Sequence, residues 1–125
     1  MSLANDGEDY VLDLFLEANL WCGLSTADPT DDGSGLAEPV GDGYARVAIT
    51  AATWDAASGG TKSNGAAITF PEATGDGWGE VTFVCIFNAE SGGDLLFSTA
   101  LDAGVTVSAG KVPRFSAGAF DVTAA

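Results

Sequence analysis

The stretch Val81-Thr82-Phe83-Val84-Cys85-Ile86-Phe87 decides the fold class of this chain. Valine, isoleucine and phenylalanine are typical of β-strands. Because successive side chains of a strand point to opposite faces, Val81, Phe83, Cys85 and Phe87 share one face, and Val84 and Ile86 lie on the other. A strand with two apolar faces must be covered on both sides. In a protein of 125 residues, we expect a second sheet to cover one face and a helix or a neighbouring subunit to cover the other.

Similar short segments recur at roughly ten-residue spacing, with turns rich in glycine, aspartate and alanine between them. The expected strands are residues 20–26, 44–50, 66–70, 80–87, 94–101, 105–108 and 115–123. Such spacing is typical of an antiparallel sandwich or barrel. We therefore predict a mainly β protein, an antiparallel β-sandwich of jelly-roll-like type with one short N-terminal helix.

The expected helix runs from Asp6 to roughly Ala18, where the apolar residues Val11, Leu12, Leu14, Phe15 and Ala18 recur at helical spacing. On such a helix three acidic residues, Asp9, Asp13 and Glu17, would share one face. We expect this acidic stripe to face solvent.

The length of the chain fits a single domain, predicted over residues 1–125. Within it we expect a flexible N-terminus at 1–8, the helix at 9–18 and the β-sandwich at 20–123. No apolar run approaches the roughly 20 residues that span a bilayer.

Eighteen Asp and Glu against four Lys and Arg give a net charge of −14. A surface of this sign repels the phosphates of nucleic acids and anionic lipid headgroups. We therefore expect neither nucleic acid nor a membrane among the partners. The same charge keeps the free subunit soluble, at the cost of self-repulsion that salt would screen.

The absence of histidine excludes Ser-His-Asp and Cys-His catalytic sites. No GxSxG or phosphate-binding GxxxxGK[ST] pattern is present. Paired carboxylates could in principle hydrolyse glycosides, but in so acidic a chain pairs arise by accident. We predict that the protein is not an enzyme, and we assign no catalytic and no cofactor-binding residues.

Cys22 and Cys85 lie in expected strands, without a CxxC spacing or a histidine partner, so a zinc site is excluded. A disulfide would need the two strands to be neighbours with suitable Cβ spacing. Buried free thiols are favoured, because a free cysteine behaves as a small apolar residue.

A loop of residues 27–43 is longer than ordinary connections, which suggests that it has a role of its own. Its start, Asp28-Pro29-Thr30-Asp31-Asp32-Gly33, partly matches a Ca²⁺-binding loop, but Pro39 stands where the bidentate glutamate belongs. Asp28, Asp31 and Asp32 are thus candidate Ca²⁺ ligands, with a plain turn as the alternative. No other cofactor is expected.

The tryptophans Trp21, Trp54 and Trp78 either pack in the core or stack on sugar rings. Trp54 lies in the least regular stretch and is the candidate ligand-contact residue. It supports an alternative function, that of a non-catalytic carbohydrate-binding module.

Several blocks, read together in their order and spacing, carry a family resemblance. They are Gly23-Leu24-Ser25-Thr26-Ala27-Asp28-Pro29, Gly43-Tyr44-Ala45-Arg46-Val47, Asn64-Gly65-Ala66-Ala67-Ile68-Thr69-Phe70-Pro71, Trp78-Gly79-Glu80-Val81-Thr82, Ile86-Phe87-Asn88-Ala89 and Gly93-Asp94-Leu95-Leu96-Phe97. The set resembles a family of small virion proteins of tailed bacteriophages and prophages, described as tail-fibre or head-fibre proteins. The likeness extends from about residue 9 to 123.

This resemblance implies a structural protein of the virion, assembled in the bacterial cytoplasm. Its implied partners are copies of itself, with a trimer favoured, and other virion proteins. A host-surface glycan is a further candidate partner, reached through the loop at 27–43. The doubly apolar strand supplies the candidate subunit interface: Val81, Phe83, Val84 and Ile86. One departure concerns that strand, where family members often have a more polar residue followed by glycine and this chain has Phe83, Val84 and Cys85.

Overall fold

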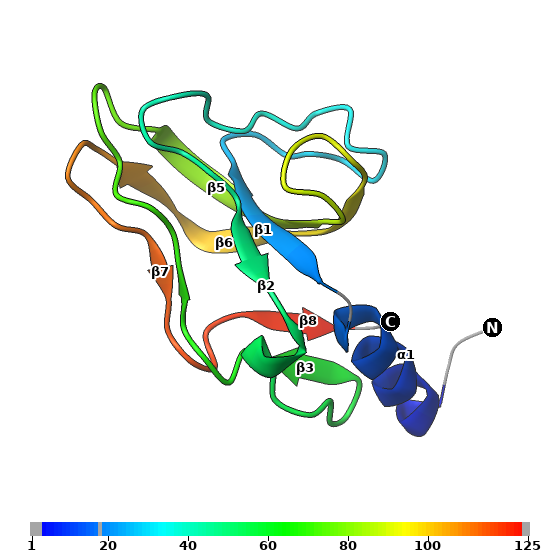
Figure 1. Ribbon diagram of the computed structural model, residues 1–125. Helices are drawn as coiled ribbons and strands as arrows, with labels where there is room; N and C mark the ends of the chain where they lie inside the picture. Colours follow the sequence, from blue (N-terminus) through cyan, green and yellow to red (C-terminus); the bar gives the residue numbers. More distant parts are fainter. Residues whose placement is uncertain (1–3, 18, 124–125) are drawn as a thin grey trace. The chain divides into compact units, whose positions relative to one another are not determined.

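The structure is a computed structural model that describes residues 4–17 and 19–123 (Figure 1). In chain order, its elements are α1 (Asn5–Glu17), β1 (Leu20–Ser25), β2 (Val47–Ile49), the 3-10 turn η1 (Ala51–Thr53), β3 (Thr61–Ser63), β4 (Ile68–Thr69), β5 (Gly79–Phe87), β6 (Leu95–Val107), β7 (Arg114–Phe115) and β8 (Asp121–Thr123). A mainly β fold with antiparallel pairing and a short N-terminal helix is confirmed. The jelly-roll arrangement stays a prediction.

The described residues group into two compact units. The helix unit is formed within Met1–Asn19, Ile49–Ile68 and Arg114–Ala125, and the sheet unit comprises Leu20–Ala48 and Thr69–Pro113. The short strands β4 and β7 lie where the chain passes from one unit to the other. The prediction of a single domain over 1–125 stays a prediction.

The sheet unit is built on a four-stranded sheet with the order β2-β1-β5-β6. β5 is an inner strand and pairs antiparallel with both β1 and β6. Its side chains are buried on both faces: Val84 and Ile86 are 2% and 0% exposed on one face, and Val81 and Phe87 are 1% exposed on the other. The strand predicted at 80–87 is therefore confirmed as β5, and residues of this single chain cover both of its faces.

β6 is one strand where two were predicted from the sequence, at 94–101 and 105–108. Its pairing with β5 steps from Val105 to Ala100 while β5 advances only from Val81 to Phe83, so residues 101–104 form a wide bulge. A glycine suits this bulge, since a Cβ on Gly104 would lie 2.8 Å from a carboxylate oxygen of Glu80. The polar and small residues Asp102, Ala103 and Gly104 of this bulge explain why the strand was predicted as two.

The two cysteines lie on neighbouring strands but on opposite faces of the sheet. Cys22 is paired with Ile86, whereas Cys85 is paired with Gly23. Since paired residues share a face and successive residues alternate, the two thiols point away from each other. Both are free and buried, as predicted.

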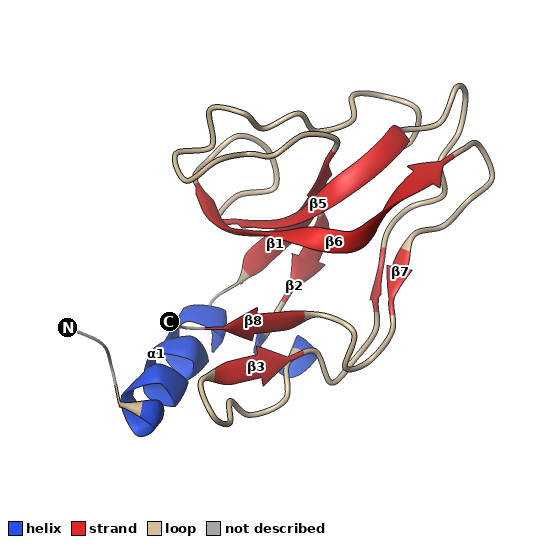
Figure 2. Cartoon of the chain, turned by 180° about the vertical axis from the view of Figure 1, so that it is seen from behind, coloured by secondary structure: helices blue, strands red, loops and turns tan. Residues whose placement is uncertain are grey.

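In the helix unit, α1 lies beside the antiparallel pair β3 and β8 (Figure 2). α1 begins at Asn5, one residue before the start expected from the apolar pattern at Asp6 and four residues before the bounds 9–18 given within the domain. Ala18 and the side chains of Val11, Leu12, Leu14, Phe15 and Glu17 lie outside the described part of the chain. Leu16, which is 1% exposed, is a core residue of this helix.

The acidic stripe of α1 was expected to face solvent, and Asp13 is indeed exposed and Asp9 partly exposed, yet both carboxylates also bind the rest of this unit. Asp9 Oδ1 accepts the main-chain N–H of Gly60 at 2.7 Å. Asp13 Oδ1 accepts the N–H of Ala57 and pairs with the ammonium of Lys62. The reason is that the glycine-rich turn before β3 offers free N–H donors that carboxylates bind well. Asp9 and Asp13 thus attach the helix to β3 and to the turn before it.

The strands of this unit differ from the expected ones in two places. β3 was not expected, because its sequence Thr61-Lys62-Ser63 has no apolar alternation. The segment 115–123 divides into β7 and β8, with a turn closed by the Ala119 N–H on the Ser116 carbonyl. The buried Asn64 holds this turn, since its Nδ2 donates to the Ser116 carbonyl and its Oδ1 accepts the N–H of Phe120.

Candidate functional site

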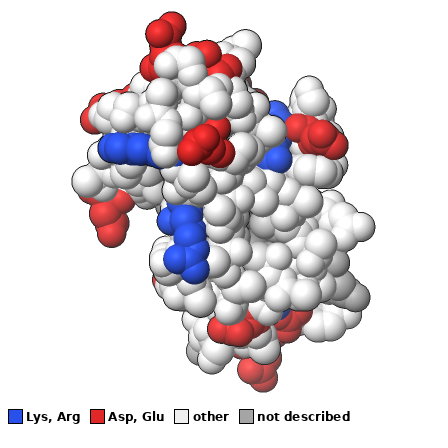
Figure 3. Space-filling view, turned by 60° about the vertical axis from the view of Figure 1, so that its left-hand side comes forward, with Lys and Arg blue, Asp and Glu red and all other residues white. Residues whose placement is uncertain are grey.

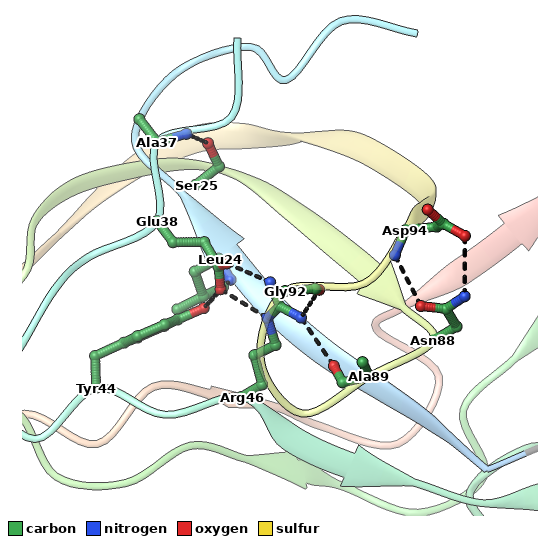
Figure 4. Close-up of polar contacts among 10 residues, drawn as sticks. All are labelled: Leu24, Ser25, Ala37, Glu38, Tyr44, Arg46, Asn88, Ala89, Gly92 and Asp94. Carbon is green, nitrogen blue, oxygen red and sulfur yellow. Dashed lines mark hydrogen bonds and ion pairs between the residues drawn. The ribbon is translucent and has the colours of Figure 1, made fainter. Parts of the chain in front are cut away.

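The most developed polar cluster of the sheet unit is centred on Arg46, just before β2. Its side chain is 6% exposed. The guanidinium donates from Nε to Glu38 Oε2 at 3.0 Å and from Nη2 to Glu38 Oε1 at 2.5 Å (Figure 4). Nη1 donates to the carbonyls of Ala89 and Gly92, each at 2.8 Å. The guanidinium carbon also lies 3.5 Å from the centroid of the Phe87 ring.

A buried charge is tolerated only when it is paired and its donors are satisfied. The forked pair with Glu38 is the strong geometry for arginine and a carboxylate. The Phe87 ring adds a cation–π contact to the same group. Arg46 therefore fastens three segments together: the long loop, defined here as residues 26–46, strand β5, and the hairpin loop, residues 88–94.

Tyr44 extends the cluster to strand β1. Its hydroxyl donates to Glu38 Oε2 at 2.5 Å and accepts the N–H of Leu24 at 3.0 Å. It thus satisfies a main-chain donor of β1. Burial, with a further contribution from Glu38, raises the pKa of Tyr44 well above its ordinary range. The ring meets Trp78 edge-on, with centroids 5.2 Å apart.

The cluster requires a glycine in β1. A Cβ on Gly23 would lie 2.8 Å from a ring carbon of Phe87, 2.9 Å from the Tyr44 hydroxyl and 3.0 Å from Glu38 Oε2. Real Cβ atoms do not approach so closely, so glycine is required here for space rather than for backbone conformation. This explains the glycine inside the otherwise bulky strand Leu20–Ser25.

Hydrogen bonds between Asn88 and Asp94 close the hairpin loop at its base. Asn88 Oδ1 accepts the N–H of Asp94 at 2.8 Å, and Asn88 Nδ2 donates to Asp94 Oδ2 at 3.2 Å (Figure 4). Gly92 and Gly93 both have positive φ, which suits the tight tip. With Arg46 bound to the Ala89 and Gly92 carbonyls, this loop is held at its tip and at its base.

A groove of about 380 Å³ lies along this arrangement and is lined by residues 38–41, 44–46 and 90–92. The Glu38 carboxylate and the Tyr44 hydroxyl already bind partners within the chain. At the rim, Val40 is 92% exposed and Glu90 is exposed. The groove is thus lined by two loops that internal bonds hold in place.

Residues 14–123 match the protein family described as podophage GP4 fiber I protein gp80. This chain belongs to that family. The resemblance to phage fibre proteins is thereby confirmed, and this fibre protein is a structural component of the virion. No curated protein matches the chain. Among the residues that the structure describes, no helix has the length and apolarity to cross a membrane.

Two of the three candidate Ca²⁺ ligands of this fibre protein, Asp28 and Asp32, accept hydrogen bonds within the long loop, and the third, Asp31, is exposed. Asp28 Oδ1 accepts the N–H of Thr30 at 2.9 Å. Asp32 Oδ1 accepts the Thr30 hydroxyl at 2.8 Å and the N–H of Ser34 at 3.0 Å, and these bonds, that from Ser34 first, lower the pKa of Asp32 to about 2. Within residues 4–17 and 19–123 no three acidic or cysteine side chains are grouped to hold a metal. Calcium binding stays a prediction.

The tryptophans are placed as packing residues. Trp54 is 7% exposed, and its ring meets Phe120 edge-on with centroids 5.6 Å apart. Trp78 is 5% exposed and donates its Nε1–H to the Asp42 carbonyl at 2.8 Å. Trp21 is half-buried. Ligand contact through Trp54 stays a prediction, and the packed ring does not favour it.

The four candidate interface residues lie together on β5. Val81, Val84 and Ile86 are at most 2% exposed, and Phe83 is half-buried. Of these four, Phe83 therefore retains surface that another subunit could contact. Since the structure describes one chain, an interface at these residues stays a prediction.

Sequence reasoning assigned no role to Glu38, Tyr44 or Arg46, although it quoted Gly43-Tyr44-Ala45-Arg46-Val47 as a family block. A signal was present in the composition. Arg46 is one of four basic residues and stands in an apolar segment, and a buried charge needs a partner. The identity of that partner depends on the fold and not on spacing in sequence.

Proposed function

We propose that this fibre protein is an assembly module that associates with copies of itself, in a trimer, and with other virion proteins, and that its two joined loops contact the host surface. The observation that supports the proposal is the Arg46 cluster, which fixes the long loop and the hairpin loop to the same strand. Loops on a rigid scaffold are common recognition surfaces. Loops that are already ordered lose less entropy when they bind.

The charge distribution is compatible with such a role. Acidic side chains are scattered over the face shown in Figure 3 rather than gathered in a single patch. The net charge of −14 keeps free subunits apart at low ionic strength. Assembly should therefore be favoured by salt, which screens the repulsion between copies.

The self-association part of the proposal is tested by measuring molar mass with light scattering over a range of protein and salt concentrations. We expect a trimer that becomes more stable as salt increases. A monomer under all of these conditions would contradict self-association, and a stable dimer would contradict the trimer alone.

The host-contact part is tested with fluorescently labelled protein on cells of the bacterium that the phage infects. Val40→Asp changes the exposed rim of the groove, and Val112→Asp makes the same change at an exposed site outside both loops. We expect Val40→Asp to weaken binding by about tenfold and Val112→Asp to have no effect. Periodate oxidation of the cell-surface glycans should abolish binding if the partner is a glycan. Equal binding of wild type and Val40→Asp would refute contact through this groove.

A further inference from the structure

Strand β6 is the last strand of the four-stranded sheet and is 13 residues long. In the part of the chain that the structure describes, no strand pairs with its outer side. Val107 is buried, whereas every other side chain of β6 is at least partly exposed. Such an edge offers main-chain N–H and C=O groups to another chain.

Natural proteins protect edge strands with lysines, prolines, charges or bulges. β6 itself contains no lysine and no proline, and the one lysine that binds its main chain, Lys111, covers only the Thr106 carbonyl near its end, at 3.2 Å. It has two irregularities in its pairing with β5, one at Leu96 and one at residues 101–104. Between them, Phe97–Ala100 pair regularly with β5. The bulges keep the straight part of the edge short, which suits a closed contact better than open-ended stacking of strands.

The sequence of β6 is also nearly free of charge, although the Glu80 carboxylate lies beside Gly104 and the Lys111 ammonium binds the Thr106 carbonyl. Residues 95–110 contain a single charged side chain, Asp102, in a chain of net charge −14. Two copies of so acidic a protein repel each other wherever their carboxylates face. An uncharged surface is where a like-charged copy can approach at the lowest electrostatic cost. Leu96 and Val105, which are 40% and 48% exposed, supply apolar area on the same strand.

We propose that β6 is the surface through which this chain docks against a second copy of itself, so that Leu96 and Val105 become buried in the contact. The proposal rests on the self-association put forward above and names the surface responsible for it. The predicted interface on β5 is a separate surface, since three of its four residues are already covered.

The test compares Leu96→Lys and Val105→Lys with Val112→Lys. All three replace an exposed apolar side chain and raise the net charge by one, but Val112 lies outside β6. We expect both β6 variants to raise the dissociation constant of the assembly by about tenfold or more. Val112→Lys should leave it unchanged or lower it slightly, because the mutual repulsion is reduced.

Hydrogen exchange provides a second readout that does not depend on a substitution. In the assembled wild type, amides of Phe97–Ala100 that point away from β5 should exchange more slowly than in the dilute, dissociated protein. Thermal melts establish that each variant is folded. Because two positions on β6 are substituted separately, the test still works if one of the two variants does not fold.

The outcomes separate this proposal from the one on which it rests. If the wild type assembles, and both β6 variants assemble as tightly with no protection at Phe97–Ala100, the β6 surface is refuted while self-association stands. If the wild type remains monomeric under all conditions, self-association itself is refuted, and with it this proposal.

Discussion

Arg46 shows how much of a loop structure can depend on one side chain. Its guanidinium binds the carboxylate of Glu38 and two carbonyls of the hairpin loop, and the Arg46 side chain itself is largely buried. Lysine could not reproduce this fork, because its ammonium is a point charge. Removal of arginine would leave the Glu38 carboxylate with the Tyr44 hydroxyl as its remaining donor and would take the Arg46 donor from both carbonyls.

We therefore predict that Arg46→Met destabilises the protein by about 3–5 kcal/mol, the usual cost of removing one partner of a buried ion pair. Urea unfolding followed by tryptophan fluorescence measures the change. Arg114→Met is the matched control, since Arg114 is exposed, and surface changes usually stay within about 0.5 kcal/mol. Equal stability of the two variants would contradict the role given to Arg46.

The burial of the two cysteine side chains also predicts how the stability of the fold changes at alkaline pH. Burial raises the pKa of the Cys22 thiol far above its ordinary value of 9.0 and raises the pKa of Cys85 to about 12. The folded protein thus keeps these protons at a pH where the unfolded chain releases them. Stability from this source is fully present below pH 9.0 and is lost as the pH rises toward the folded pKa values.

The expected loss is about 1.4 kcal/mol per pH unit for each thiol. Urea unfolding at a series of alkaline pH values measures it. Cys22→Ala serves as the comparison, because the slope of its unfolding free energy against pH should decrease by about one proton. The same slope in both proteins would show that Cys22 ionises as readily in the folded state as in the unfolded chain.

At the scale of elements, the alternation of apolar residues in the sequence predicted the buried strands well. It did not predict segments that are held by polar contacts. β1 and β5 occur within one residue of their expected bounds, because their side chains are buried in alternating or continuous apolar runs. The expected strand 44–50 begins only at Val47, since Tyr44 and Arg46 contribute to the loop cluster instead.

The candidate site escaped prediction for a related reason. Arg46 contacts residues 8 to 46 positions away in the sequence. Only the register of β5 and the path of the long loop bring these residues together. No sequence pattern identifies such partners, whereas the apolar period of a strand is local.

The attachment of α1 gives a prediction at this scale. Asp13→Ala removes the carboxylate that binds Lys62 and the N–H of Ala57. We expect faster hydrogen exchange in α1 and a lower melting temperature, with Asp6→Ala, in the first turn of the helix, as the control. Unchanged exchange in α1 would mean that this contact does not hold the helix.

The Lys62 hydrogen bond, followed by that of Ala57, lowers the pKa of Asp13 below 3.8. Its stabilising contribution is therefore present above that pH and is lost as the pH falls below it. Acid should abolish the difference between wild type and Asp13→Ala, and a difference that persists at low pH would contradict this assignment.

At the scale of the whole molecule, the excess of negative charge is the main source of repulsion within the folded chain. With a net charge of −14 and two of its four basic residues held in the ion pairs of Arg46 and Lys62, the folded chain is subject to self-repulsion. Salt screens this repulsion over a Debye length of about 10 Å at 0.1 M.

We predict that the melting temperature rises between low salt and about 0.5 M NaCl, as screening relieves the repulsion among carboxylates. Calorimetry at low protein concentration, where assembly is absent, measures the effect on the single chain. A matched titration with CaCl₂ at constant ionic strength separates screening from binding. A rise with calcium beyond that of NaCl would support the site at Asp28, Asp31 and Asp32, and a melting temperature that falls with NaCl would refute the screening argument.

The placement of the two thiols has a practical consequence. Lying on opposite sides of one sheet and shielded from water, they cannot bond to each other, so a change from reducing to oxidising surroundings should leave the fold as it is. A thiol-reactive dye would label only molecules that have opened. The protein thus contains a natural chemical reporter of its own unfolding, which can be read inside intact phage particles without any engineered tag.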